Sequence, residues 1–209
     1  MEAKKTAIRS INKIAETQYF LRPIMVKSLK QFILSEDMQK SHQGTKNYFD
    51  FWTKSFGDKF FDMGTLIRLA TEIELGLQYY YMEKRNISRS VDLKRDDYFE
   101  NNIFQRLLPG GKSNSALIIY KEVLKYDLFN NSQLKHIQEL VLCRHLYAHK
   151  SGLLYDHFMK EYLELTGVDL RKTNHIGHYP DEEVYFFEPL DRLKTFIEAA
   201  RKFFEEFPE

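Results

Sequence analysis

Hydrophobic residues recur three and four positions apart along most of the chain, the spacing that places them on one face of an α-helix. It predicts long helices at about residues 5–20, 24–39, 59–85, 133–149 and 189–206, and shorter ones at about 48–56, 96–107, 114–129 and 155–165. There is no internal repeat and no sustained heptad pattern. The pattern therefore predicts an all-α fold, organised as one antiparallel helical bundle with extra N-terminal helices.

Three residues help to place the helices. Pro23 is expected to end or kink the first helix, because proline lacks the backbone N–H that a helix interior needs. Ser132 is a suitable N-cap for the helix that follows it. Gly76 lies inside the longest predicted helix, where it either costs about 1 kcal/mol relative to alanine or allows another helix to approach closely.

The C-terminal third has clear stop signals. Gly152 and Gly167 are expected to close the helices that precede them, because glycine readily adopts the left-handed conformation at a helix end. The stretch 168–187 has no helical period, and a short extended piece is predicted at 184–187.

Composition narrows the class of protein. The 31 basic and 30 acidic residues give a net charge of +1, so any binding of nucleic acid must come from a local patch. The 17 Phe and 13 Tyr are more than an ordinary core of this size requires, and part of them is expected at an interface. The single cysteine, Cys143, fits a reducing, cytoplasmic setting. No apolar run approaches the roughly 18 residues that a membrane span needs.

The most informative chemistry lies at the end of the helix predicted at 133–149. Arg144, His145 and His149 fall within one and a half turns, and the two histidines share a face because they are four residues apart. Histidine suits acid–base catalysis near neutral pH. The simpler interpretation is structural: Arg144 pairs with a carboxylate, and both histidines cap the helix end.

A metal site is an alternative use of these histidines. Two histidines four residues apart on a helix can bind zinc, but a site requires three or four converging ligands. Further candidate ligands are His136, Asp156, His157, His175 and His178. The spacing itself does not bring them together.

The arginine, a polar residue after it and a histidine five positions on, near the end of a helix in an all-α chain, resemble the signature of the HEPN superfamily (higher-eukaryote and prokaryote nucleotide-binding domains). The resemblance covers about residues 132–206 and continues past the motif into the helix that ends at Gly167 and the final amphipathic helix. It implies a HEPN-like core at about 59–206, with an N-terminal extension at about 1–56.

Many proteins of this family are metal-independent endoribonucleases of toxin–antitoxin, antiviral-defence (abortive infection) and RNA-processing systems. The resemblance implies that Arg144 holds the scissile phosphate, that His149 acts as general acid or base, and that His145 fills the polar position after the arginine. It also implies a homodimer in which both motifs line one cleft, and no cofactor or metal. Lys150, Arg171 and Lys172 are the basic residues expected to bind RNA.

Further partners follow from the same family: an RNA substrate and an antitoxin or activator protein. One subgroup of toxins carries a tyrosine two residues after the motif histidine, where this chain has Ser151, so regulation at that tyrosine is not expected. The alternative function is a non-catalytic helical module that binds a partner protein or a nucleotide, which the aromatic content and near-zero charge favour.

Overall fold

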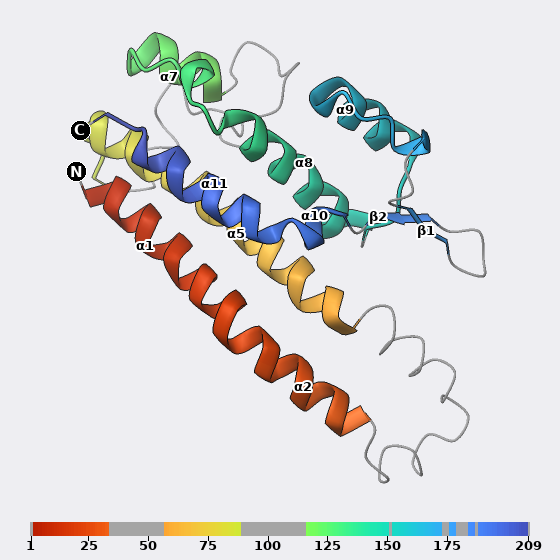
Figure 1. Ribbon diagram of the computed structural model, residues 1–209. Coiled ribbons are helices and arrows are strands. Elements are labelled where there is room, and N and C mark those ends of the chain that lie inside the picture. The colour runs from red at the N-terminus through yellow and green to blue at the C-terminus, as the bar shows by residue number, and fades with distance from the viewer. Residues whose placement is uncertain are drawn as a thin grey trace.

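The computed structural model describes residues 2–33, 57–88, 116–150, 152–172, 176–178, 184–186 and 188–208. The fold is all-α, as predicted, with one small strand pair (Figure 1). Its helices are α1 (Glu2–Glu16), α2 (Arg22–Ile33), α5 (Gly57–Lys84), α7 (Ala116–Val123), α8 (Leu134–Lys150), α9 (Asp156–Thr166), α10 (Glu188–Asp191) and α11 (Leu193–Glu205), with short turns η1 (Thr17–Leu21), η4 (Leu128–Asn130) and η5 (Leu170–Lys172). The predicted helices at 48–56 and 96–107 lie outside the described residues.

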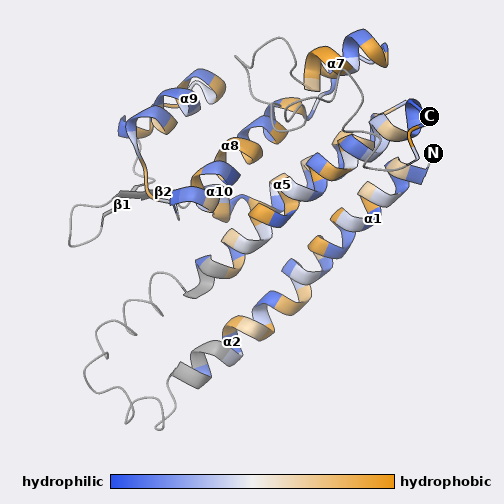
Figure 2. Ribbon diagram, turned by 180° about the vertical axis from the view of Figure 1, so that it is seen from behind, coloured by the Kyte–Doolittle hydropathy of each residue, from blue (hydrophilic) through white to orange (hydrophobic). Residues whose placement is uncertain are grey.

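Helix α5 is the centre of the molecule. It contacts α1, α2, α8, α10 and α11, and its buried side chains run along nearly its whole length, from Met63 to Met82. Such a helix must be apolar on more than one side, and hydrophobic residues recur along the coloured length of α5 in Figure 2. This confirms the long helix predicted at 59–85.

Gly76 on α5 lies where three helices meet. A Cβ atom there would be 2.5 Å from the Phe204 ring on α11 and 2.9 Å from the Ala7 Cβ on α1. Both contacts are too close for real atoms, so the glycine permits the close approach of helices that its position in the sequence suggested. Through it α1, which buries Ala7 and Ile11, shares one core with α5 and α11.

The two ends of the chain lie side by side (Figure 1). The Glu83 carboxylate on α5 accepts hydrogen bonds from the first backbone N–H groups of α1, at 2.8 Å for Ala3. Lys4 Nζ donates to the carbonyl of Phe207 at 2.7 Å. Much of the aromatic content gathers near this end, in a cluster of Tyr80, Tyr120, Tyr126, Phe203, Phe204 and Phe207 rings. These rings belong mainly to the core.

Pro23 does not end the first helix. The chain passes from α1 to α2 through η1, a π-turn in which the Arg22 N–H donates to the Thr17 carbonyl five residues earlier. A π-turn widens the helix locally, which relieves the crowding that a proline ring causes against the preceding turn. The helical path therefore continues through the proline.

Two other predicted boundaries were wrong. The helix predicted at 114–129 ends at Val123, because Lys125 adopts a left-handed conformation with φ of 57° and the Tyr126 N–H turns back to the Tyr120 carbonyl at 3.0 Å. The helix predicted at 189–206 is divided into α10 and α11 at Arg192, whose backbone leaves helical geometry (φ −97°, ψ 14°).

Within the stretch 168–187, which has no helical period in the sequence, the structure describes two short strands. Strands β1 (Ile176–His178) and β2 (Val184–Phe186) pair antiparallel, with Ile176 opposite Phe186. Strand β2 agrees with the extended piece predicted at 184–187. No helix in the described ranges is long and apolar enough to cross a membrane.

Candidate functional site

Helix α8 carries the predicted motif in its last two turns. Just before its start, the side-chain oxygen of Asn131 accepts the Gln133 backbone N–H at 3.0 Å, in a turn that leads into the helix. Ser132, the predicted cap, is instead bound to the Glu206 carboxylate through both its hydroxyl and its backbone N–H. Ser132 is therefore engaged by a residue at the C-terminal end of α11 and does not cap α8.

The end of α8 is fixed by β2. Tyr147 is buried, and its hydroxyl donates to the carbonyl of Phe186. The Phe186 N–H in turn donates to the carbonyl of Gly152 at 3.0 Å. Gly152 has φ of 90°, and a Cβ atom there would lie 2.8 Å from the Tyr147 ring. Only glycine suits this turn, which confirms its predicted role after the helix.

The two motif histidines lie side by side at the surface. The ring centroids of His145 and His149 are 4.6 Å apart, with 54° between the ring planes, and both residues are exposed. This is the shared face that the spacing of four predicted. The two imidazoles are thus open to solvent and close enough to contact one ligand together.

His145 has a shifted protonation equilibrium. Although the residue is exposed overall, partial desolvation of its ring lowers its pKa below the usual value of 6.5. The positive charges of His149 and Arg144 lower it further, and Glu161 on α9 acts in the opposite direction. The neutral imidazole, which is able to accept a proton, is therefore favoured at neutral pH.

Arg144 faces α5 and is paired there with Glu74. Its Nη2 lies 3.7 Å from the Glu74 carboxylate oxygen, with the side chains 27% and 14% exposed. This distance is too long for a hydrogen bond, and the Arg144 Nε and the other Glu74 oxygen are buried without a hydrogen-bonding partner in the described part of the chain. The pair is an electrostatic contact in which hydrogen-bonding capacity remains unused.

Glu74 was not anticipated from the sequence, although a signal exists. It lies between buried Ile73 and Leu77 on the long apolar helix, where a charged side chain requires a partner. Burial raises the pKa of Glu74 above its usual 4.5, and the Arg144 charge partly counteracts this. The intrachain carboxylate that the structural interpretation required is therefore present.

The three residues expected to bind RNA are all exposed, but only one of them lies on the same helix as the motif. Lys150 is the last residue of α8. Arg171 pairs with Asp156 at the start of α9 at 2.8 Å, and Lys172 pairs with Asp169 at 3.3 Å. Both cations lie on η5, and each pairs with a nearby acidic residue and not with a residue of the motif.

The histidine metal site finds no geometric support in what the structure describes. Within those ranges no three His, Cys, Asp or Glu side chains gather so as to hold a metal ion. His157 pairs with Glu161 at 3.5 Å on α9, while His175 lies outside the described residues. Cys143 is buried, and burial raises the pKa of its thiol well above the usual value.

No protein-family model, no curated protein and no solved structure matches this chain.

Proposed function

We propose that this chain is a metal-independent endoribonuclease of the HEPN type, with its active site at the C-terminal end of α8. The observation that carries the proposal is the pair of exposed imidazoles, 4.6 Å apart, on the helical turn that also bears Arg144. RNA supplies its own nucleophile, the 2′-hydroxyl, so the protein must only move protons and stabilise charge on the phosphate.

We assign the two proton transfers to the two histidines. His145, with its lowered pKa, takes the proton of the 2′-hydroxyl as its oxygen attacks the phosphorus. His149 gives a proton to the 5′ oxygen as the P–O5′ bond breaks. The products are a 2′,3′-cyclic phosphate and a 5′-hydroxyl end, and one proton is taken up for each one released.

Arg144 is suited to the charge on the phosphate. A guanidinium binds two phosphate oxygens through parallel N–H groups. The contact to Glu74 is 3.7 Å long and the Arg144 side chain is 27% exposed, so the guanidinium is not held by a hydrogen bond to Glu74 and its exposed part is proposed to bind the phosphate. Lys150, Arg171 and Lys172 are the cations proposed to contact the RNA beyond the scissile phosphate.

The experiment uses purified wild-type protein, Arg144→Ala, His145→Ala and His149→Ala with mixed RNA in the presence of EDTA. Matched controls are Arg201→Ala, another arginine in a surface ion pair, and His136→Ala, another histidine of α8. Cleavage by wild type and both controls, with cyclic phosphate ends and loss in the three motif variants, supports the proposal. Equal cleavage by all six places the activity elsewhere.

Pairing of two motifs in one cleft, which the family resemblance implies, is tested separately. Arg144→Ala and His149→Ala chains are mixed after each is shown to be inactive. Partial recovery of cleavage means that one site draws residues from two chains, whereas its absence means that each chain carries its own site. A role in a toxin or antiviral-defence system, controlled by an antitoxin or activator protein, is part of the same proposal.

A second candidate function is a non-catalytic module that binds a partner protein or a nucleotide. The Glu74–Arg144 contact favours it, because an arginine held by a carboxylate of its own chain is the structural alternative to a catalytic one. Absence of cleavage in every variant, with saturable binding of a mononucleotide that Arg144→Ala abolishes, supports this second function.

A further inference from the structure

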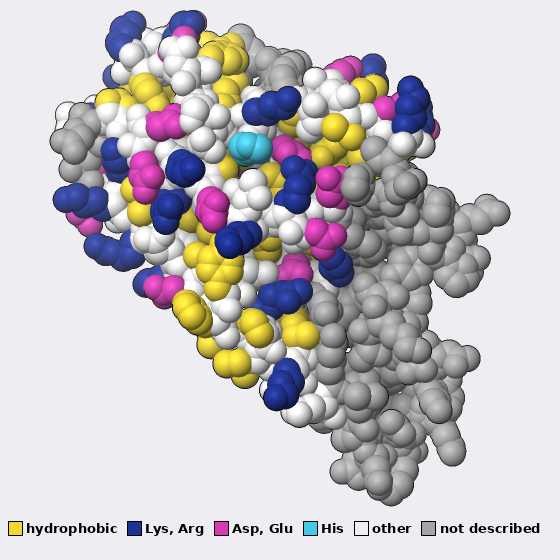
Figure 3. Space-filling model, viewed as in Figure 1, with side chains coloured by type: hydrophobic (Ala, Val, Ile, Leu, Met, Phe, Trp, Pro, Cys, Tyr) yellow, Lys and Arg dark blue, Asp and Glu magenta, His cyan; other side chains and the backbone are white. Residues whose placement is uncertain are grey.

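Five large hydrophobic side chains are exposed along the helical path through η1 and α2. Tyr19, Phe20, Leu21, Ile24 and Met25 have exposed fractions between 40% and 71%, and together they are called the α2 patch. Hydrophobic side chains gather over this part of the surface in Figure 3, toward the lower end of the molecule. An apolar patch of this kind is about as large as the largest patch on a typical monomeric protein, and such patches are often functional.

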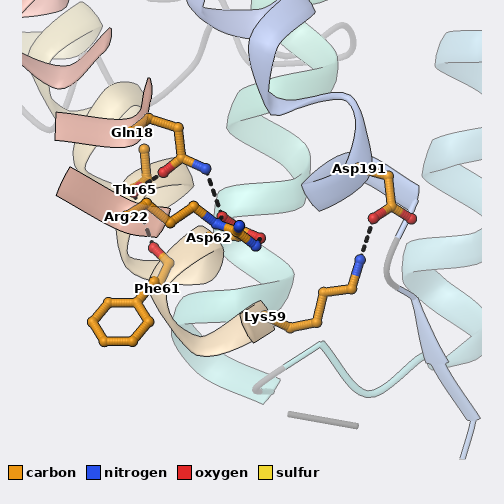
Figure 4. A network of polar contacts seen from close by, with 7 residues as sticks. All are labelled: Gln18, Arg22, Lys59, Phe61, Asp62, Thr65 and Asp191. Carbon is orange, nitrogen blue, oxygen red and sulfur yellow. Dashed lines mark hydrogen bonds and ion pairs between the residues drawn. The ribbon is translucent and has the colours of Figure 1, made fainter. Parts of the chain in front are cut away.

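The patch faces outward because the opposite side of the same helix is anchored on α5. Asp62 of α5 accepts hydrogen bonds from Gln18 at 2.6 Å and from Arg22 Nη2 at 2.6 Å (Figure 4). Residues 18 and 22 therefore face α5, which turns Phe20 and Ile24 away from it. Asp62 is itself buried, so this orientation is held by a charged pair rather than by loose contact.

A hollow adjoins the patch. It has a volume of about 220 Å³ and lies between the end of α1, η1 and α5, where Ile14, Thr17, Phe61 and Gly64 line it. A Cβ atom on Gly64 would meet no atom within 4 Å. Thr17, which lines the hollow, lies two residues before Tyr19 of the α2 patch on the same helical path.

The area of the patch is suited to self-association. If each large side chain can bury roughly 200 Å², the observed exposures leave on the order of 500 Å² of apolar surface. The same patch on two chains then offers about 1,000 Å², which is the lower limit for a specific interface. We propose that the α2 patch joins two copies of this chain, with their α2 helices antiparallel across a two-fold axis.

Charges beside the patch select the antiparallel arrangement. Glu16 and Lys27 are both exposed, one before Phe20 and the other after Ile24. When two such helices cross antiparallel near these residues, Glu16 of each chain faces Lys27 of the second copy. A parallel arrangement would instead bring like charges together, which is unfavourable.

This surface is separate from the end of α8. Asp62 and Glu74, which hold the patch and Arg144 respectively, are twelve residues apart on α5, or about 18 Å at 1.5 Å per residue. The self-association proposal therefore does not depend on the proposed ribonuclease activity. It places the two-fold axis away from the motif, so in a dimer held by the α2 patch each chain carries its own motif instead of sharing one cleft with its partner.

Sedimentation equilibrium of the full chain tests the proposal. Wild type at micromolar concentration is expected to have twice the chain mass of 25.0 kDa. Phe20→Asp is expected to weaken association by about 100-fold, because it buries a charge at an aromatic anchor. Phe129→Asp, the same change at a phenylalanine of η4 that is 59% exposed, should leave the mass unchanged. Circular dichroism checks that both variants fold.

Three results overturn the proposal: a monomeric wild type, equal dissociation of both aspartate variants, and a dimer that resists Phe20→Asp but separates on Lys150→Glu at the end of α8. The last result would place the dimer at the motif.

Charge reversal tests the antiparallel geometry. Glu16→Lys and Lys27→Glu are each expected to weaken association by roughly fivefold, and the double variant should recover the wild-type affinity. A double variant weaker than either single change would contradict the antiparallel pairing.

Discussion

Two arginine–glutamate pairs join α8 to its neighbours, and they are built differently. Glu139 of α8 binds Arg192, at the junction of α10 and α11, through both carboxylate oxygens, and it accepts the Tyr162 hydroxyl at 2.6 Å. Glu74 and Arg144 approach only to 3.7 Å. Each contains a buried nitrogen or oxygen without a partner, but only the first pair is hydrogen-bonded.

The difference separates a hydrogen-bonded structural pair from a pair whose hydrogen-bonding capacity is unused, as the proposed role of Arg144 requires. Glu139 is 6% exposed, and it accepts hydrogen bonds from buried Tyr162 and from partly exposed Arg192. Burial, and then Glu139, raise the pKa of Tyr162. This chain can therefore build a tight pair where it needs one. The looser contact at Arg144, beside two exposed histidines, is the arrangement expected where the arginine has a second partner.

The largest effect is expected at the structural pair. Glu139→Ala leaves Arg192 without its carboxylate and should cost about 2–4 kcal/mol of unfolding free energy, reduced from the full value for a buried pair because Arg192 is partly exposed. Urea denaturation measures the change. Tyr162→Phe, which removes one hydrogen bond, should cost about 1 kcal/mol, and a similar loss for both would mean that the pair contributes little.

The next effect is at the turn that follows the motif. Gly152→Ala should lower the unfolding free energy by about 1–3 kcal/mol, because its backbone is left-handed and the new Cβ meets Tyr147. Gly167→Ala is the control, since its φ is also positive but it has open space around it. Its cost should be about 1 kcal/mol. Thermal denaturation of both variants gives the comparison, and equal losses would exclude a role for the Tyr147 contact.

The loose pair is expected to behave in the opposite way from the tight one. Burial raises the pKa of Glu74 in the folded state, so its ionised form opposes folding, and stability falls as pH rises from 4.5 through that folded pKa. Glu74→Gln should therefore gain up to about 1 kcal/mol at pH 7. The gain should disappear below pH 4.5, where the carboxyl is protonated in both states. Urea denaturation at the two pH values measures this.

Cleavage by Glu74→Gln gives a second comparison. If the carboxylate holds Arg144 in place for the phosphate, activity should fall by about tenfold while stability does not. A variant that is both less stable at pH 7 and fully active would place Glu74 with Glu139 as a structural residue.

The smallest effect concerns protonation. NMR titration should find the pKa of His145 below 6.5, and either His149→Ala or Arg144→Ala should raise it by removing a positive charge. Glu161→Gln should lower it further, because the negative charge of Glu161 favours the protonated ring. Movement of the pKa in the same direction in all three variants would show that these charges do not act on His145.

Spacing in the sequence was enough to predict the local features of this protein. The 3.6-residue period predicted the all-α fold and the helices that became α5, α8 and α9, because a buried helical face imposes that period directly. The juxtaposition of His145 and His149 followed in the same way, since four residues make about one turn. The turns at Gly152 and Gly167 followed from backbone chemistry.

Only the tertiary structure decided what depends on distant residues. Glu74 and Arg144 are 70 positions apart, and nothing in either local pattern indicates their contact. Ser132 binds the Glu206 carboxylate and does not cap α8, and the last helix breaks at Arg192, which reaches a carboxylate on α8. The exposure of Phe20 and Ile24 likewise follows from Asp62 holding the other side of their helix. Local spacing fixes which residues share a face, but which face is covered depends on the free energy of packing the whole chain.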